Sequence, residues 1–118
     1  MAKVLIVDDS RFMLKTMRTL LEKAGHEVVA EASDGIHAYV EYEKHRPDLV
    51  TLDLNMPLLC GMDTIEAILS TFADARIIVV TSEQKQDTII ECIKKGAKHY
   101  IIKPVTHDNL IAALDKVL

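Results

Sequence analysis

The chain has no tryptophan, and only 4% of its 118 residues are aromatic, so any stable core must be built from aliphatic side chains. It has no apolar stretch approaching the roughly 20 residues that a membrane-spanning helix needs. The short apolar run near the N-terminus ends at Asp8, with no small-residue cleavage site of the kind that follows a signal peptide. We therefore expect a cytoplasmic protein that does not insert into a membrane.

Cysteine is scarce too. Cys60 and Cys92 belong neither to a CxxC motif nor to a cysteine–histidine group with metal-ligand spacing, so we expect two free thiols. The five histidines are scattered along the chain, which argues against a zinc site.

Basic blocks are also missing. The formal net charge is -4, so direct nucleic-acid binding through charge is not expected. A length of 118 residues suits one compact domain, and we assign residues 1–118 to a single domain.

What the sequence does have is a regular alternation of apolar runs and helical periodicity. Strands are predicted at residues 4–7, 27–32, 48–54, 76–81 and 99–103. Helical stripes follow them at residues 13–24, 38–42, 62–72, 89–93 and 110–118. Ser10 and Thr106 are predicted N-caps, and Gly25 and Gly96 are predicted helix ends. Five strands that alternate with five helices indicate an α/β fold, a parallel sheet covered by helices on both faces.

Polar side chains stand where the predicted strands end. Asp8 and Asp9 follow the first strand, Asp53 ends the third, Thr81 ends the fourth and Lys103 ends the fifth. Ligands of open α/β sheets bind beyond the carboxyl ends of the strands. We therefore expect three carboxylates, a hydroxyl and an ammonium group to meet at one edge of the sheet.

Carboxylates gathered in this way repel one another unless a cation neutralises them. Carboxylate and carbonyl oxygens suit magnesium (Mg²⁺), and no soft ligand is present to favour zinc. A metal site beside a lysine and a hydroxyl is typical of phosphoryl transfer. Asp53 stands alone between the acid pair and Lys103, which makes it the best candidate nucleophile for an aspartyl phosphate.

Other α/β functions find no support. The first predicted strand is not followed by GxGxxG, so a dinucleotide-binding fold is not indicated. The chain also contains neither the GxxxxGK[ST] of a P-loop nor the GxSxG of a nucleophile elbow.

Taken together, four pieces of sequence resemble the receiver domain of two-component response regulators. These are VDDS at 7–10, DLNMPLLCG at 53–61, Thr81, and KP at 103–104. The resemblance covers the whole chain. It implies a flavodoxin-like (βα)5 doubly wound fold, with a five-stranded parallel sheet in the order 2-1-3-4-5.

The resemblance also implies roles at the site. Asp53 would accept a phosphoryl group from a sensor histidine kinase or a phosphotransfer protein. Asp9, Asp53 and the backbone carbonyl of Asn55 would bind Mg²⁺, with Asp8 acting through a water molecule. Lys103 would contact the phosphoryl group after transfer.

Further roles concern signalling. Thr81 would also contact the phosphoryl group, and the rotamer of Tyr100 would follow Thr81 as a switch. Pro104 would follow a cis peptide bond that aims the Lys103 side chain. The surface formed by the fourth helix, fifth strand and fifth helix would bind a downstream protein target. The resemblance leaves open whether the chain is a monomer or a phosphorylation-dependent homodimer.

Asn55 and Glu83 lie two residues after Asp53 and Thr81, where family members tune hydrolysis of the aspartyl phosphate. This pair resembles chemotaxis-type CheY-like proteins, so we favour a stand-alone protein of that type. One alternative is a receiver excised from a larger DNA-binding or effector regulator. Another, from a different class, is a Mg²⁺-dependent phosphatase that works through Asp53. A receiver would catalyse only its own phosphorylation and dephosphorylation.

The sequence also departs from the family pattern. Val105 stands where many relatives have Phe, and Ser82 where a small Ala is common. Leu58, Leu59 and Cys60 are more apolar than is usual in their loop. They form either a docking patch or a segment that packs on the adjacent helix.

Overall fold

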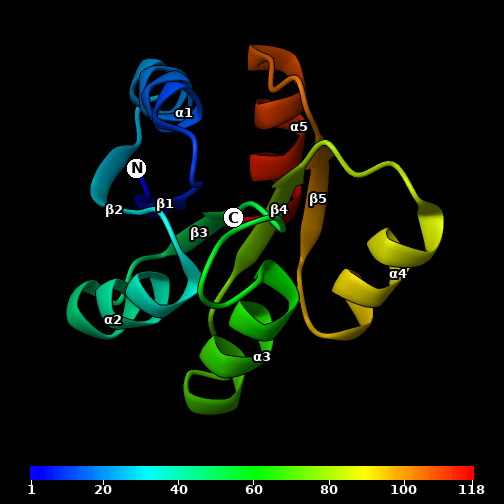
Figure 1. Ribbon diagram of the computed structural model, residues 1–118. Helices are drawn as coiled ribbons and strands as arrows, with labels where there is room; N and C mark the ends of the chain where they lie inside the picture. The colour runs from blue at the N-terminus through cyan, green and yellow to red at the C-terminus, as the bar shows by residue number, and fades with distance from the viewer.

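A computed structural model describes residues 1–118, and its five strands form one sheet in the order β2-β1-β3-β4-β5 (Figure 1). Every neighbouring pair of strands is parallel. The strands are β1 (Lys3–Val7), β2 (Glu27–Ala32), β3 (Leu49–Leu52), β4 (Ile77–Thr81) and β5 (His99–Ile102). The helices are α1 (Arg11–Lys23), α2 (Gly35–His45), α3 (Gly61–Thr71), α4 (Gln86–Lys94) and α5 (His107–Val117). The predicted α/β fold and strand order are thus confirmed.

Two apolar layers cover the sheet, one on each face. One layer joins alternate strand residues such as Leu5 and Val79 to α2, α3 and α4. The other joins residues such as Val4 and Ile78 to α1 and α5. In Figure 1, α1 and α5 lie above the sheet and α2 and α3 below it. The central strands β3 and β4 are buried on both faces, which explains why their sequences read as continuous apolar runs.

Local capping signals determine several helix ends. The Ser10 side chain accepts a hydrogen bond from the Met13 amide at 3.3 Å, as expected for the N-cap of α1. Thr106 and Asn109 form a capping box at the start of α5. Gly25 has a φ of 88°, a left-handed conformation that a glycine adopts without strain just beyond the end of α1.

Strand β3 is shorter than predicted. It ends at Leu52, because Asp53 and Leu54 already belong to the loop that leads to α3. The amide of Gly61 donates a hydrogen bond to the carbonyl of Leu54 at 2.9 Å and so closes that loop. Asp53 therefore lies at the very edge of the sheet, one residue beyond the ladder.

The predicted stripe of α4 is only partly buried. Ile89 lies in the core together with Cys92, whereas the exposed fractions of Ile90 and Ile93 are 45% and 42%. Both thiols are free, with Cys60 exposed and Cys92 buried. None of the helices has the length and apolar character required to cross a membrane.

Candidate functional site

Three aspartates meet at the carboxyl edge of the sheet. Parallel pairing of β1 with β3 sets Val7 beside Leu52, so the residues that follow each strand emerge side by side. Oxygen atoms of Asp8, Asp9 and Asp53 all lie within 4.8 Å of one another. Asp8 and Asp53 are buried, with exposed fractions of 6% and 5%, whereas Asp9 is exposed.

Lys103 reaches the same cluster from the end of β5. Its Nζ atom lies 3.0 Å from Oδ2 of Asp8 and 3.8 Å from Oδ2 of Asp53. The backbone amide of Lys103 donates to the carbonyl of Thr81 at 2.7 Å, which ties the lysine to β4. The peptide bond between Lys103 and Pro104 is cis.

The three carboxylates differ in how they are engaged. Oδ1 of Asp8 accepts the Ser10 amide at 2.9 Å, and its Oδ2 accepts Lys103. Asp9 makes no side-chain hydrogen bond or ion pair and faces solvent. Burial and the Asp8 carboxylate raise the pKa of Asp53, and the charge of Lys103 offsets this only in part. Asp8 is thus engaged through both carboxylate oxygens, Asp53 only through the longer ion pair with Lys103, and Asp9 through neither kind of contact.

The oxygen donors present fit a hard divalent cation. Carboxylates crowd together beside the exposed residue Asn55, and no sulfur or imidazole ligand belongs to the cluster. Such a donor set is suited to Mg²⁺ or a similar ion, which keeps several of its waters.

Thr81 lies fully buried at the end of β4, and its Oγ1 accepts the Glu83 amide at 3.0 Å. The hydroxyl proton of Thr81 remains available for a second partner. Tyr100 pairs with Val79 across β4 and β5, so its side chain shares a face of the sheet with Thr81. Tyr100 is half-buried and packs against the core beneath α2, α3 and α4.

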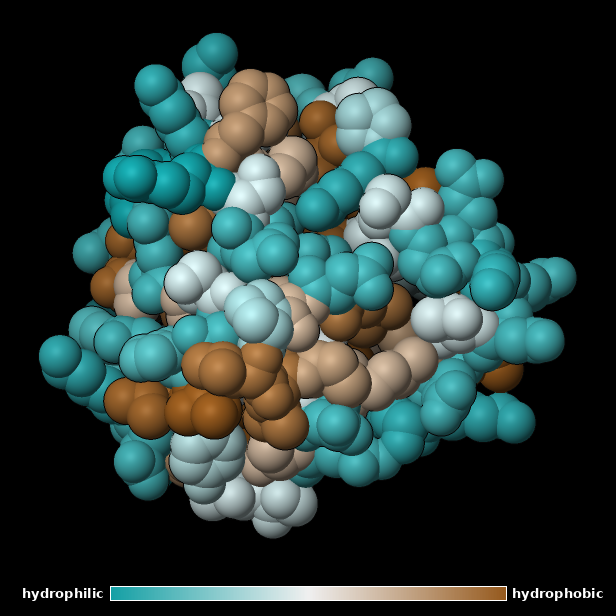
Figure 2. Space-filling model, viewed as in Figure 1, coloured by the Kyte–Doolittle hydropathy of each residue, from teal (hydrophilic) through white to brown (hydrophobic).

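The apolar loop residues separate in the structure. Leu58 has a φ of 68° and an exposed fraction of 73%. Leu59 is half-buried and lies against Gly35 at the start of α2, so packing on the adjacent helix accounts for this residue. Figure 2 shows brown side chains gathered over α2. Ile36 and Val40 of that helix are exposed, as is Leu58.

Two residues near the site were missed in the sequence. Gly35 allows α2 to approach the loop before α3, and Thr64 donates its hydroxyl to the carbonyl of Cys60 at 2.8 Å. The Ser-Asp-Gly run at 33–35 was the available signal, because Asp34 is the N-cap of α2. Nothing local in the sequence shows which loop the glycine meets.

The sheet is doubly wound and five-stranded, and its acidic cluster and lysine lie at the point where the strand order reverses. These features together define a receiver-type α/β domain. Residues 4–115 match the family model of the response regulator receiver domain. The chain belongs to that family, as the sequence motifs indicated.

Similar proteins agree closely in length. The chain is 42% identical over 115 residues to the chemotaxis protein CheY of Thermotoga maritima, covering 98% of this chain and 96% of that protein. It is 41% identical over 116 residues to CheY of Bacillus subtilis, covering 98% and 97%. Among solved structures, the Borrelia burgdorferi CheX–CheY–BeF3–Mg²⁺ complex matches with a TM-score of 0.93 and 32% identity. That match covers 95% of this chain and 85% of the other.

Proposed function

We propose that this protein is a phosphorylation-dependent switch in which Asp53 accepts a phosphoryl group from a sensor histidine kinase or a phosphotransfer protein. One observation carries the proposal. Asp53 is a buried carboxylate with two further aspartates within 4.8 Å and the Lys103 ammonium 3.8 Å away. This arrangement surrounds one nucleophile with groups that bind and neutralise phosphoryl oxygens.

Mg²⁺ would be held by Asp9, Asp53 and the backbone carbonyl of Asn55, with Asp8 contributing through a water molecule. The engagement of both Asp8 oxygens, by Ser10 and Lys103, supports its indirect role. When bound, the ion neutralises charge on the carboxylates and on the transferred group.

In the transfer step, a carboxylate oxygen of Asp53 forms a bond to phosphorus while the bond from phosphorus to the donor imidazole nitrogen breaks. Lys103 then binds one phosphoryl oxygen, and the free hydroxyl proton of Thr81 donates to another. Water later hydrolyses the aspartyl phosphate, at a rate tuned by Asn55 and Glu83. No external substrate is turned over.

The signal would leave the site through Thr81 and Tyr100, which share one face of the sheet. A Thr81 hydroxyl drawn toward the phosphoryl group vacates space for the Tyr100 ring, which shifts the population between two states. The target surface consists of α4, β5 and α5, and Ile90 and Ile93 expose apolar area on it.

The similarity to CheY proteins favours a chemotaxis-type role in the cytoplasm. The chain is 42% and 41% identical to the two CheY proteins described above. It is 36% identical over 110 residues to the uncharacterized transcriptional regulatory protein YhcZ of Bacillus subtilis. The net charge of -4 and the lack of basic blocks favour a downstream protein rather than DNA as the proposed partner.

Acetyl phosphate and Mg²⁺ provide a direct test, with the added group located by peptide mass spectrometry. We expect a single phosphoryl group on Asp53 that is absent after chelation of Mg²⁺ and absent in Asp53→Ala. Asp63→Ala, which removes an exposed carboxylate in the first turn of α3, is the matched control and should still be modified. Modification that persists in Asp53→Ala would refute the proposal. Sustained turnover of a small phosphate ester would favour a phosphatase instead.

A further inference from the structure

Gly35 occupies the first position of α2 and faces the loop between β3 and α3. A methyl group at this position would lie 2.7 Å from Cβ of Leu59. It would come still closer to the backbone carbonyl oxygen of Leu59 and to Oγ1 of Thr64, well inside van der Waals contact. Any larger residue at position 35 therefore has to displace the loop or the helix.

Space, rather than backbone conformation, explains this glycine. The glycines with positive φ are Gly25 and Gly96, so Gly35 adopts a backbone conformation open to any residue. Within a helix, glycine is less favourable than alanine by up to about 1 kcal/mol. The close approach of Leu59 is what excludes the more favourable residue.

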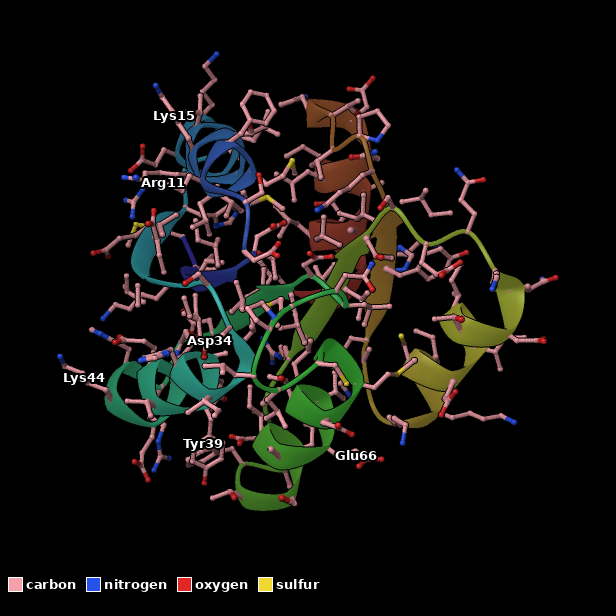
Figure 3. The ribbon with its side chains drawn as sticks, viewed as in Figure 1. Arg11, Lys15, Asp34, Tyr39, Lys44 and Glu66 are labelled. Atoms are coloured by element: carbon pink, nitrogen blue, oxygen red, sulfur yellow. The ribbon has the colours of Figure 1, made fainter.

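The helix side of this contact is firmly held. Oδ1 of Asp34 accepts the His37 amide at 2.7 Å, and its Oδ2 lies 2.6 Å from the His37 ring. Asp34 is buried, and Figure 3 shows it at the start of α2, beside the loop that precedes α3. These bonds hold the first turn of α2 in place, so we expect the loop to yield rather than the helix.

The loop that Leu59 belongs to begins at Asp53 and is closed by backbone hydrogen bonds. The Leu59 amide donates to the carbonyl of Pro57 at 2.8 Å, and the Gly61 amide donates to that of Leu54 at 2.9 Å. These bonds make residues 53–61 a compact, closed turn. Asn55 lies within the same turn, so we expect a displacement at Leu59 to be felt there.

We propose that Gly35 is a positioning residue for the phosphorylation site. It lets the backbone of Leu59 rest on α2, and this contact sets the position of the turn that presents the Asn55 carbonyl to a divalent cation. The inference rests on the function proposed above for Asp53 and Asn55. Gly35 itself touches neither the cation nor the phosphoryl group.

Gly35→Ala tests the proposal, with Ile36→Ala as a matched control at an exposed position of the same helical turn. Mg²⁺ affinity is measured by calorimetry, phosphorylation by acetyl phosphate is followed across Mg²⁺ concentrations, and folding is checked by circular dichroism. We expect Gly35→Ala to raise the Kd for Mg²⁺ roughly tenfold, as loss of an outer-shell support does. Phosphorylation should slow most when Mg²⁺ is below saturation. Ile36→Ala should match the wild type.

Gly35→Ala/Thr64→Ala removes one of the atoms that the new methyl group meets, and should recover part of the lost Mg²⁺ affinity. If Gly35→Ala does not fold, the Kd of this double variant decides the question by the same criterion. A folded variant with wild-type Mg²⁺ affinity overturns the inference, even if its stability is lower. Failure of the wild-type chain to bind Mg²⁺ or to become phosphorylated would instead overturn the proposed function.

Discussion

The Nζ atom of Lys103 lies 3.0 Å from Oδ2 of Asp8, although 95 residues separate the two in sequence. The contact joins the end of β5 to the end of β1, across the edges of β3 and β4. The same Nζ atom lies 3.8 Å from Oδ2 of Asp53. Lys103 therefore offsets part of the repulsion between the carboxylates of Asp8 and Asp53. The charge balance of the aspartate cluster therefore depends on a residue positioned by β5, the last strand in the sequence.

Replacing this lysine should separate metal binding from phosphoryl transfer. In Lys103→Met, Asp8 and Asp53 lose the positive charge beside them, so the pKa of Asp53 should rise further and Mg²⁺ should bind more tightly. Phosphorylation by acetyl phosphate at saturating Mg²⁺ should fall roughly 100-fold, because a charged donor to the transferred group is missing. Calorimetry and initial rates check the two effects. Lys94→Met, at an exposed position of α4, should alter neither, and weaker Mg²⁺ binding in Lys103→Met would contradict the expectation.

Mg²⁺ should stabilise the folded chain through the aspartate cluster. At a Mg²⁺ concentration ten times its Kd, linkage predicts an increase of about 1.4 kcal/mol in the free energy of unfolding. Urea denaturation with Mg²⁺ or with a chelator measures this difference. Asp9→Ala removes an exposed ligand and should abolish most of the gain at the same Mg²⁺ concentration, with little effect on stability in chelator. An undiminished gain would rule out Asp9 as a direct ligand.

Stability should depend on pH through the N-cap of α2. Burial opposes ionisation of Asp34, but hydrogen bonds from the His37 amide and ring outweigh it and lower the pKa of Asp34. The folded chain therefore holds this proton less tightly than the unfolded chain does. The resulting stabilisation is fully present above the unfolded pKa and is lost as pH falls through the lowered folded pKa.

Asp34→Ala should accordingly reduce the free energy of unfolding by about 1 kcal/mol at neutral pH and by less in strong acid. Urea denaturation over a pH series measures the difference. Ser33→Ala, at an exposed neighbouring position, should show no such dependence. A cost for Asp34→Ala that stays constant into acid would show that the charge of Asp34 is not what stabilises the helix.

The coupling between Thr81 and Tyr100 can be followed by fluorescence, because the chain has no native tryptophan. In Tyr100→Trp, phosphorylation of Asp53 should change the emission as the ring at position 100 changes its burial. Adding Thr81→Ala should leave Asp53 open to phosphorylation, confirmed by mass spectrometry, but should suppress the emission change. An equal change in both proteins would disprove a relay through Thr81.

Local signals in the sequence predicted the elements of the fold well. Ser10 and Thr106 cap their helices as expected, since capping depends on a side chain and an amide only three residues away. The predicted ends of the strands were less accurate. Strand β3 was predicted to reach residue 54 but ends at Leu52, because Leu54 already belongs to the turn that its hydrogen bond with Gly61 closes. On α4, Ile90 and Ile93 face outward, because the orientation of a helix is set by its packing on the sheet.

For the candidate site, the sequence by itself determined which functional groups meet at the edge of the sheet. Three aspartates and a lysine follow strands of one parallel sheet, a threonine ends another, and the carboxyl ends of parallel strands share one edge. Only the tertiary structure decided how these groups are distributed: Lys103 lies nearer to Asp8 than to Asp53, and Leu59 rests on Gly35. These relationships depend on the separation of strands and on the contact of a loop with a distant helix. Side-chain periodicity predicts neither the separation of strands nor the loop–helix contact. It indicates which face of a strand or helix a residue occupies, but not which residue of another element packs against that face.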